Sequence, residues 1–213
     1  MKVLVTGFDP FGGESINPAF EAVKALPDTL GTIEIIKKEI PTVFYKSLDC
    51  IDGLINTFSP DIIICVGQAG GRSDISIEKV GINLNEARIP DNEGNQPQNK
   101  PVYSDGETAY FSNLPLKGMI KDLHASKVPA SISYTAGTYV CNHVLYGVSY
   151  LVDKKYSHIK SGFIHVPFLP EQVVGKSNMP SMTVETITKA LEICIKACEK
   201  YETDIEYISG TTH

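Results

Sequence analysis

The stretch Ile62-Ile63-Ile64-Cys65-Val66-Gly67-Gln68-Ala69-Gly70-Gly71 decides the fold class of this chain. It opens with a short run of apolar, mostly β-branched residues, which predicts a strand, and it ends in a glycine-rich turn that stops the strand. Similar runs recur along the chain and predict further strands at Val3–Thr6, Ile33–Ile40, Ile132–Thr135 and Gly162–Val166.

Helical patterns fill the gaps between these runs. Asn17-Pro18 offers a side chain that can cap a helix, followed by a proline at the first helical position, where its missing N–H costs nothing. The alternation of strands and helices predicts a single α/β domain over residues 1–213, with a mostly parallel, twisted sheet and helices on both faces. In such sheets, ligands gather at the carboxyl ends of the strands. The predicted helices are Ala19–Leu26, Val43–Phe58, Leu116–Ala125, Asn142–Asp153 and Thr183–Tyr201.

The composition argues against several classes of protein. The net charge is −6, and the basic residues are scattered rather than gathered into a stripe that would neutralise successive phosphates, so no nucleic-acid partner is expected. The apolar N-terminal run Val3–Val5 is far too short for a signal-peptide core or a membrane span. Five cysteines without a C-x-x-C pair argue against a disulfide framework and a thiolate zinc site. These features predict a cytoplasmic protein that does not bind a membrane.

One long polar segment, Glu86–Glu107, is rich in Asn, Pro, Asp and Gly and predicts an unusually long loop. Compact domains seldom carry about twenty structureless residues without a use. The segment is therefore expected to cover a substrate or to contact a subunit, and the sequence leaves both possibilities open.

Cys141 is the strongest candidate for a reactive residue. It follows the turn Thr135–Val140, after a predicted strand and at the start of a predicted helix. The free N–H groups and the positive end of the helix dipole favour the thiolate, which is the nucleophilic form of cysteine. We therefore predict that Cys141 is a nucleophile, with a buried structural cysteine as the alternative.

A base and an acid can be found for this nucleophile. His165 ends an apolar predicted strand, on the sheet edge where Cys141 should also emerge, and a histidine there can act as a general base. His143 competes for the role, but it lies two residues after Cys141 on a helix and would point away from it. Glu78, in the alternating run Ile75–Asn83, is the candidate acid that orients the imidazole.

Other segments carry weaker signals. Gly67–Gly71 follows a strand and could cradle an anion, but it lacks the spacing of dinucleotide and phosphate-binding loops, so a tight turn that lets backbone approach a substrate is the better interpretation. Phe8 and Phe11 lie on a stiff loop after the first strand and are either core residues or walls of a small flat pocket. We predict no metal, because the histidines show no metal-binding spacing. The five histidines are His124, His143, His158, His165 and His213.

Taken together, four blocks of the sequence resemble the pyroglutamyl peptidase I family, also called pyrrolidone-carboxylate peptidases, over nearly the whole chain. Agreement in the order and spacing of four blocks is far more specific than any single motif. One departure is Lys79, where the family pattern has an arginine beside the glutamate. The blocks are Thr6–Gly13 with Asn17-Pro18; Gly67–Arg72 with Glu78 and Ala87–Asn92; Thr135–Asn142; and His165–Gln172.

The resemblance implies a cysteine exopeptidase that removes N-terminal pyroglutamate from peptides through a triad of Cys141, His165 and Glu78 and a thioester intermediate. It implies no cofactor, and it implies a homotetramer. By the same resemblance, the substrate-binding residues are Phe8 and Phe11 as pocket walls, Gln68 as a contact to the lactam, Arg88 near the oxyanion site, and Asn17.

Two other interpretations remain open from the residues alone. A nucleoside phosphorylase-like enzyme on a similar sheet would hold phosphate at Gly67–Arg72, and its turnover would depend on phosphate. A non-catalytic module that recognises capped peptides would leave Cys141 as an ordinary, unreactive thiol.

Overall fold

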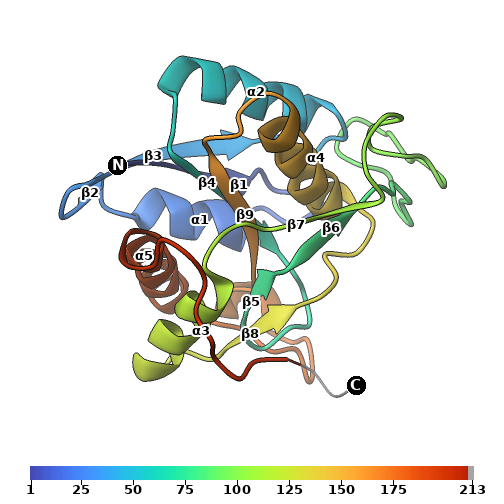
Figure 1. Cartoon of the computed structure of the whole chain (residues 1–213). Coiled ribbons are helices and arrows are strands. Elements are labelled where there is room, and N and C mark those ends of the chain that lie inside the picture. Colours follow the sequence, from blue (N-terminus) through green and yellow to red (C-terminus); the bar gives the residue numbers. More distant parts are fainter. Residues whose placement is uncertain (211–213) are drawn as a thin grey trace.

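The computed structural model describes residues 1–210 and is built around one seven-stranded sheet. The strands of this sheet are β1 (Lys2–Phe8), β2 (Thr29–Leu30), β3 (Ile33–Ile40), β4 (Ile62–Gln68), β5 (Ile75–Glu78), β8 (Ala130–Ser133) and β9 (Lys160–Val166). Their order is β2-β3-β1-β4-β9-β5-β8, and all neighbouring pairs are parallel except β2–β3 and β5–β9 (Figure 1). The predicted α/β class with a mostly parallel sheet is confirmed. His213 lies outside the described residues.

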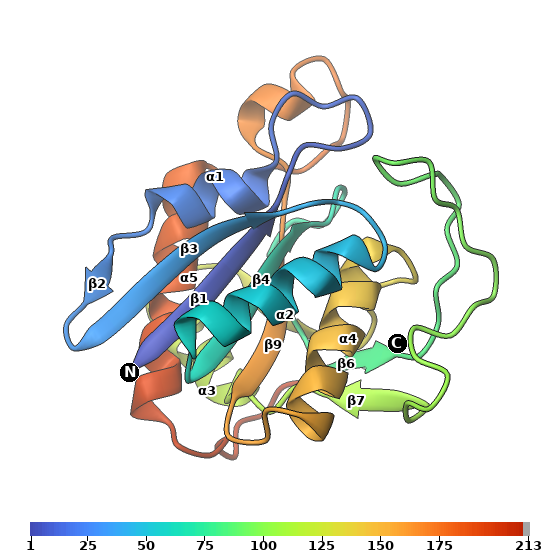
Figure 2. The ribbon, with the colours of Figure 1, turned by 90° about the horizontal axis from the view of Figure 1, so that it is seen from above.

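Helices cover both faces of the sheet, as predicted. The helices are α1 (Pro18–Ala25), α2 (Lys46–Phe58), α3 (Leu116–Ala125), α4 (Val140–Lys154) and α5 (Val184–Lys200), with a short 3-10 helix, η1 (Pro170–Val173). Alternate residues of β1 enter two separate cores. Val3 and Val5 pack with α1, α3 and α5, whereas Leu4 packs with α2 and α4. Figure 2 shows the sheet between these two helical layers.

The helix boundaries follow local chemistry. Asn17 caps α1 as predicted, because its Oδ1 accepts a hydrogen bond from the Ala19 N–H at 3.1 Å. Helix α2 begins at Lys46 rather than at Val43, because Tyr45 has a φ of 60°, which a right-handed helix does not allow. Within residues 1–210, no helix has both the length and the apolar character that crossing a bilayer requires.

The alternating run Ile75–Asn83 forms two strands rather than one. After β5 the chain leaves the main sheet as β6 (Val80–Ile82), which pairs with β7 (Ala109–Phe111) in a second sheet. A Cβ at Gly81 would lie 2.8 Å from the backbone nitrogen of Tyr146, so β6 lies directly against α4. Neither β7 nor the two-residue β2 was predicted, because such short strands leave no alternating pattern to detect.

Candidate active site

Cys141 lies in the first turn of α4 and is partly exposed. The backbone N–H groups of a first helical turn have no acceptor within the helix, so their positive ends surround this side chain. The thiol packs over β4 at Gly67, where a Cβ would lie 3.0 Å from Cys141 Sγ and 2.7 Å from the Phe163 ring. A glycine at position 67 therefore makes room for the thiol directly over the sheet.

His165 and Glu78 come together on the same face of the sheet, next to Gly67. His165 is the β9 residue that pairs with Gly67. Because β5 runs antiparallel to β9, Ser76 lies opposite His165 and Glu78 lies two residues further along on the same face. The bond between His165 Nδ1 and Glu78 Oε1 is 2.7 Å long, and the two residues are 4% and 0% exposed.

This bond fixes the form of the imidazole. A carboxylate oxygen accepts, so His165 Nδ1 carries the hydrogen and Nε2 is the nitrogen with a free lone pair. A neutral histidine in this tautomer is a proton acceptor at Nε2, which is the form that a general base requires.

Arg72 completes this group, and the sequence analysis did not identify it. Its Nη1 donates to Glu78 Oε1 at 2.7 Å, and its Nη2 donates to the backbone oxygen of Thr135 at 2.9 Å. The sequence offered one signal. A buried carboxylate needs an opposite charge, and Arg72 is the basic residue just ahead of β5.

Burial sets the resting charges of the nucleophile and the base. It raises the pKa of the Cys141 thiol to about 12, Glu78 adds to the effect, and Arg72 opposes it. Burial also lowers the pKa of His165, although the hydrogen bond and charge of Glu78 work in the other direction. The resting pair is therefore a neutral thiol and a neutral imidazole. The position of Cys141 at a helix N-terminus was expected to favour the thiolate, but burial raises the pKa of the thiol instead.

His143 does not belong to this group. Its Nε2 accepts from the Tyr45 N–H at 2.8 Å, and its Nδ1 lies 3.0 Å from Asn85 Oδ1. Burial lowers its pKa to about 3. Both ring nitrogens are engaged with neutral groups away from Glu78, so His143 is a core histidine.

The two predicted pocket phenylalanines occupy different environments. Phe8 is 2% exposed, and its ring centroid lies 6.2 Å from that of Phe163, whose ring is in turn 4.9 Å from the His165 ring. Phe11 is partly exposed and lies 6.3 Å from Tyr139, the residue before α4. Phe8 is therefore a core residue that packs on Phe163, the ring beside His165. Phe11 is placed to form part of the rim of the site.

Asn17 and Gln68 are both held by hydrogen bonds. Asn17 is 2% exposed, caps α1 and donates from Nδ2 to the backbone oxygen of Asp9, so it fixes the loop that carries Phe11. Gln68 ends β4. Gln172 Oε1 accepts from the Leu169 N–H, which leaves Gln172 Nε2 to donate to Gln68 Oε1 at 3.1 Å. Within residues 1–210, the amide nitrogen of Gln68 donates no hydrogen bond.

Arg88 is exposed and lies in the Glu86–Glu107 loop, which forms no helix or strand. Its side chain borders a cavity of about 230 Å³ whose walls include Tyr139, two residues before Cys141. The remaining lining residues are Glu86, Ile89 and Thr138. Arg88 thus lies at the edge of the site rather than in contact with Glu78 or His165.

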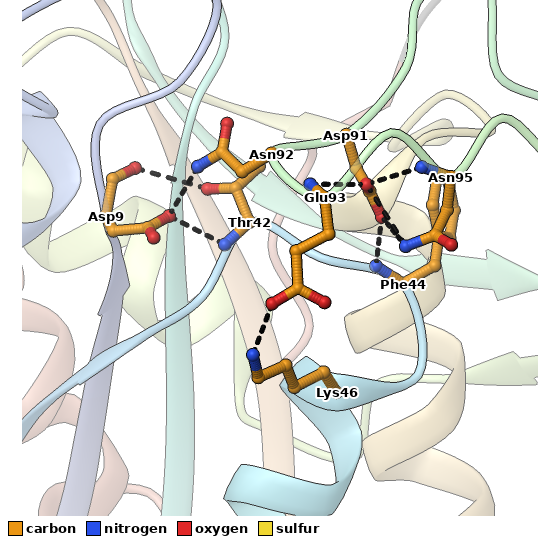
Figure 3. A network of polar contacts seen from close by, with 8 residues as sticks. All are labelled: Asp9, Thr42, Phe44, Lys46, Asp91, Asn92, Glu93 and Asn95. Carbon is orange, nitrogen blue, oxygen red and sulfur yellow. Dashed lines mark hydrogen bonds and ion pairs between the residues drawn. The ribbon is translucent and has the colours of Figure 1, made fainter.

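The first half of this loop is fastened to the sheet edge by a buried carboxylate (Figure 3). Asp91 accepts from the backbone N–H groups of Phe44, Glu93 and Asn95 at 2.8–2.9 Å, and from the Asn95 side chain. Burial alone would raise the pKa of Asp91, but these hydrogen bonds together hold it below its usual value. The loop is therefore anchored beside α2.

A second set of contacts ties the same loop to the end of β1. Asn92 Nδ2 donates to the backbone oxygen of Pro10 at 2.9 Å, and the Asn92 N–H donates to the backbone oxygen of Thr42 at 3.2 Å. Lys46 and Glu93 form an ion pair beside them. These contacts place the loop next to the carboxyl ends of β1 and β3, where ligands bind in such sheets.

The glycine-rich turn after β4 is explained by close packing. A Cβ at Gly70 would lie 2.4 Å from the Phe168 ring, and Gly67 lies against Cys141. Arg72, at the end of the turn, is engaged by Glu78. Among residues 1–210, no group of three or more His, Cys, Asp or Glu side chains is arranged to hold a metal ion.

The chain is similar in sequence and in structure to known peptidases. A family model described as pyroglutamyl peptidase matches residues 1–201. A pyrrolidone-carboxylate peptidase of Clostridium botulinum is 59% identical over 210 residues, which is 99% of each chain. One from Enterococcus faecalis is 57% identical over 213 residues, which is 100% of each chain. The crystal structure of pyroglutamyl peptidase I from Bacillus amyloliquefaciens superposes with a TM-score of 0.94 at 50% identity, covering 97% of this chain and 98% of that one.

Proposed function

This chain belongs to the pyroglutamyl peptidase family of cysteine peptidases, and on that premise we propose that Cys141, His165 and Glu78 form a triad that cleaves the amide bond after an N-terminal pyroglutamyl residue. One observation carries the proposal. The 2.7 Å bond from His165 to buried Glu78 lies beside Gly67, the residue over which the Cys141 thiol packs.

The mechanism starts from the neutral pair. His165 Nε2 takes the thiol proton as Cys141 Sγ attacks the carbonyl carbon, so the C–S bond forms as charge develops on the carbonyl oxygen. The C–N bond then breaks, and His165 gives its proton to the departing amine. Water, deprotonated by His165, attacks the resulting thioester and releases pyroglutamate and the free thiol. Glu78 orients the ring and stabilises the imidazolium in each step.

The developing oxyanion needs a hydrogen-bond donor. The Cys141 backbone N–H, in the first turn of α4, has no acceptor within the helix and is the nearest candidate. One such donor contributes about 3 kcal/mol of transition-state stabilisation. Arg88, at the rim, adds positive charge on the loop side.

Specificity follows from the chemistry of the lactam, which is compact, flat and uncharged. An ordinary N-terminal ammonium would lose its hydration in such a site at a cost of several kcal/mol. Gln68, whose amide nitrogen donates no hydrogen bond within the described part of the chain, is suited to bind the lactam carbonyl, with Phe11 at the pocket rim. We therefore assign the substrate class as peptides with an N-terminal pyroglutamate.

The test is the release of a fluorophore from a pyroglutamyl amide by the purified, reduced protein, beside the prolyl and glutamyl amides. The proposal predicts cleavage of the pyroglutamyl substrate alone, lost after treatment with a thiol-blocking reagent and unchanged by a chelator. No cleavage by folded protein would point to the binding module.

The same proposal includes one catalytic domain over residues 1–213, a cytoplasmic location and a homotetramer. The cysteines of the described chain are all free, which suits a reducing compartment. Light scattering on the purified protein tests the assembly, and a monomer at assay concentration would remove the tetramer from the proposal without affecting the catalytic scheme.

A further inference from the structure

Glu78 is a carboxylate with no exposed surface, and its surroundings must account for its charge. Burying a carboxylate without an opposite charge beside it costs several kcal/mol or more. Its Oε1 accepts two hydrogen bonds, whereas its Oε2 has no partner within residues 1–210. The charge is therefore balanced almost entirely through one oxygen.

The titratable and charged groups that face Glu78 come from three elements. His165 lies on β9, Cys141 on α4, and Arg72 on the loop between β4 and β5. Lys79, the next residue on the chain, turns away and places its Nζ 5.7 Å from the Phe111 ring centroid. Arg72 is thus the cationic residue that pairs with the negative charge of Glu78. Its side chain is 31% exposed, whereas that of Glu78 is 0% exposed.

Arg72 also reaches the segment that carries the nucleophile. Its Nη2 donates to the Thr135 backbone oxygen, in the loop between β8 and α4. The planar guanidinium holds its donors in a fixed relation, so contacts to Glu78 and to Thr135 fix the acid relative to this loop. A lysine has one nitrogen and cannot reproduce both contacts in this geometry.

We propose that Arg72 is a positioning residue of the catalytic group: its guanidinium pairs with the buried Glu78, holds Oε1 against His165 Nδ1, and ties the acid to the loop that leads to Cys141. The inference deepens the proposed function and rests on it for the activity readout alone.

The charge of Arg72 should have a measurable effect on the pKa values of His165 and Cys141. Glu78 raises the pKa of both His165 and Cys141, and Arg72 lowers both. Without Arg72 the uncompensated carboxylate makes the imidazole harder to deprotonate and the thiol harder to ionise. The acid limb of the activity profile, where His165 must be neutral, then moves to higher pH, and so does the alkylation profile of Cys141.

The experiment compares Arg72→Gln and Arg72→Lys with a matched control, Lys79→Gln, which removes the same charge from the residue next to Glu78. Two profiles are measured against pH: kcat/KM on a pyroglutamyl amide, and the rate of Cys141 alkylation by iodoacetamide, read by peptide mapping. We expect Arg72→Gln to lower kcat/KM at pH 7 by at least about tenfold and to shift both profiles upward by on the order of one pH unit.

The variants separate charge from geometry. Arg72→Lys should keep the profiles near the wild-type pH and still lose part of kcat/KM, because it retains the charge without the contact to Thr135. Lys79→Gln should match the wild type in both profiles. Folded Arg72→Gln with wild-type profiles would overturn the inference, and so would an equal shift in Lys79→Gln.

A folding defect would also be informative. If Arg72→Gln does not fold, the cause predicted here is the unpaired Glu78, and the double variant Arg72→Gln with Glu78→Gln should recover a cooperative unfolding transition. A double variant that also fails to fold would contradict the role. The alkylation profile needs no substrate, so it decides the inference even if no pyroglutamyl amide is cleaved and the proposed function fails.

Discussion

Two buried histidines, His165 and His143, differ in the charge of their hydrogen-bond partners, and the proposed reaction uses only His165. His165 on β9 and His143 on α4 are 4% and 0% exposed, and each places Nδ1 against a side-chain oxygen, Glu78 Oε1 at 2.7 Å and Asn85 Oδ1 at 3.0 Å. Burial lowers the pKa of both. They differ in the charge of the partner and in the second ring nitrogen.

His143 has neutral partners at both nitrogens, since Tyr45 donates to Nε2, and nothing opposes burial in lowering its pKa to about 3. His165 has a carboxylate at Nδ1, and within residues 1–210 no hydrogen bond engages its Nε2. Burial alone makes a histidine a neutral structural group. A charged partner and a free nitrogen make it a base, and these two features depend on its neighbours in the fold.

The largest effect should separate the two histidines directly. His165→Ala and Cys141→Ser should each lower kcat/KM on a pyroglutamyl amide by at least about 10³-fold, because they remove the base and the nucleophile. His143→Gln should stay within about threefold per folded molecule, since its ring takes no part in the reaction. Circular dichroism and thermal melts establish the folded fraction, and a similar loss in His143→Gln would break the comparison.

Replacing the charged partner should give the next largest effect. Glu78→Gln keeps a side chain of the same size but removes the charge that orients and stabilises the imidazolium, so kcat/KM should fall by roughly 10²-fold or more. Glu78 raises the pKa of His165, and its removal should therefore move the acid limb of the profile to lower pH. A pH profile of kcat/KM measures this, and an upward shift would show that the charge assignment is wrong.

Gly67→Ala tests the packing that brings the nucleophile to His165. The new Cβ would lie 2.7 Å from the Phe163 ring and 3.0 Å from Cys141 Sγ, so one of them must move. We expect a loss of about ten- to a hundredfold in kcat/KM, because small displacements of reacting groups are costly. Gly53→Ala is the control. It is an exposed position in α2 with nothing within 4 Å, where alanine should raise stability by up to about 1 kcal/mol. Full activity of Gly67→Ala would remove the packing argument.

The last effect concerns stability rather than rate. His143 has a pKa of about 3 in the folded protein against 6.5 for the free group, so the unfolded chain binds one more proton between these values. The stability that His143 contributes is present above pH 6.5 and is lost as the pH falls toward 3, at up to about 1.4 kcal/mol per pH unit. Urea unfolding between pH 7 and pH 4 should show a shallower dependence for His143→Gln than for the wild type. Equal slopes would mean that His143 titrates normally.

The sequence predicted the strand–helix alternation because each element carries its own periodicity. It also predicted Asn17 as the cap of α1, because capping is local. It did not predict that β5 runs antiparallel to β9, and the position of Glu78 beside His165 depends on that pairing. The direction of a strand is decided by the connections and contacts of the whole sheet.

Arg72 and Asn85 show the same limit. Each binds a histidine or its partner that is distant in sequence, and no local pattern marks either residue. Lys79, which departs from the family pattern, does not pair with Glu78, because its side chain lies over the Phe111 ring. Residues whose role depends on their neighbours in sequence could be predicted from the sequence, whereas residues that bind a distant partner could be identified only from the fold.

The most direct test of the account is to trap the covalent intermediate and locate it. The wild-type protein is mixed with an excess of an activated pyroglutamyl ester, quenched in acid within milliseconds to seconds, and mapped by mass spectrometry of its peptides, beside His165→Ala and His143→Gln. The account predicts a pyroglutamyl group on Cys141 in the wild type and in His143→Gln, and its slow formation in His165→Ala. Acylation at another residue, or an equal rate in His165→Ala, would contradict the assignment of His165 as the base that activates Cys141.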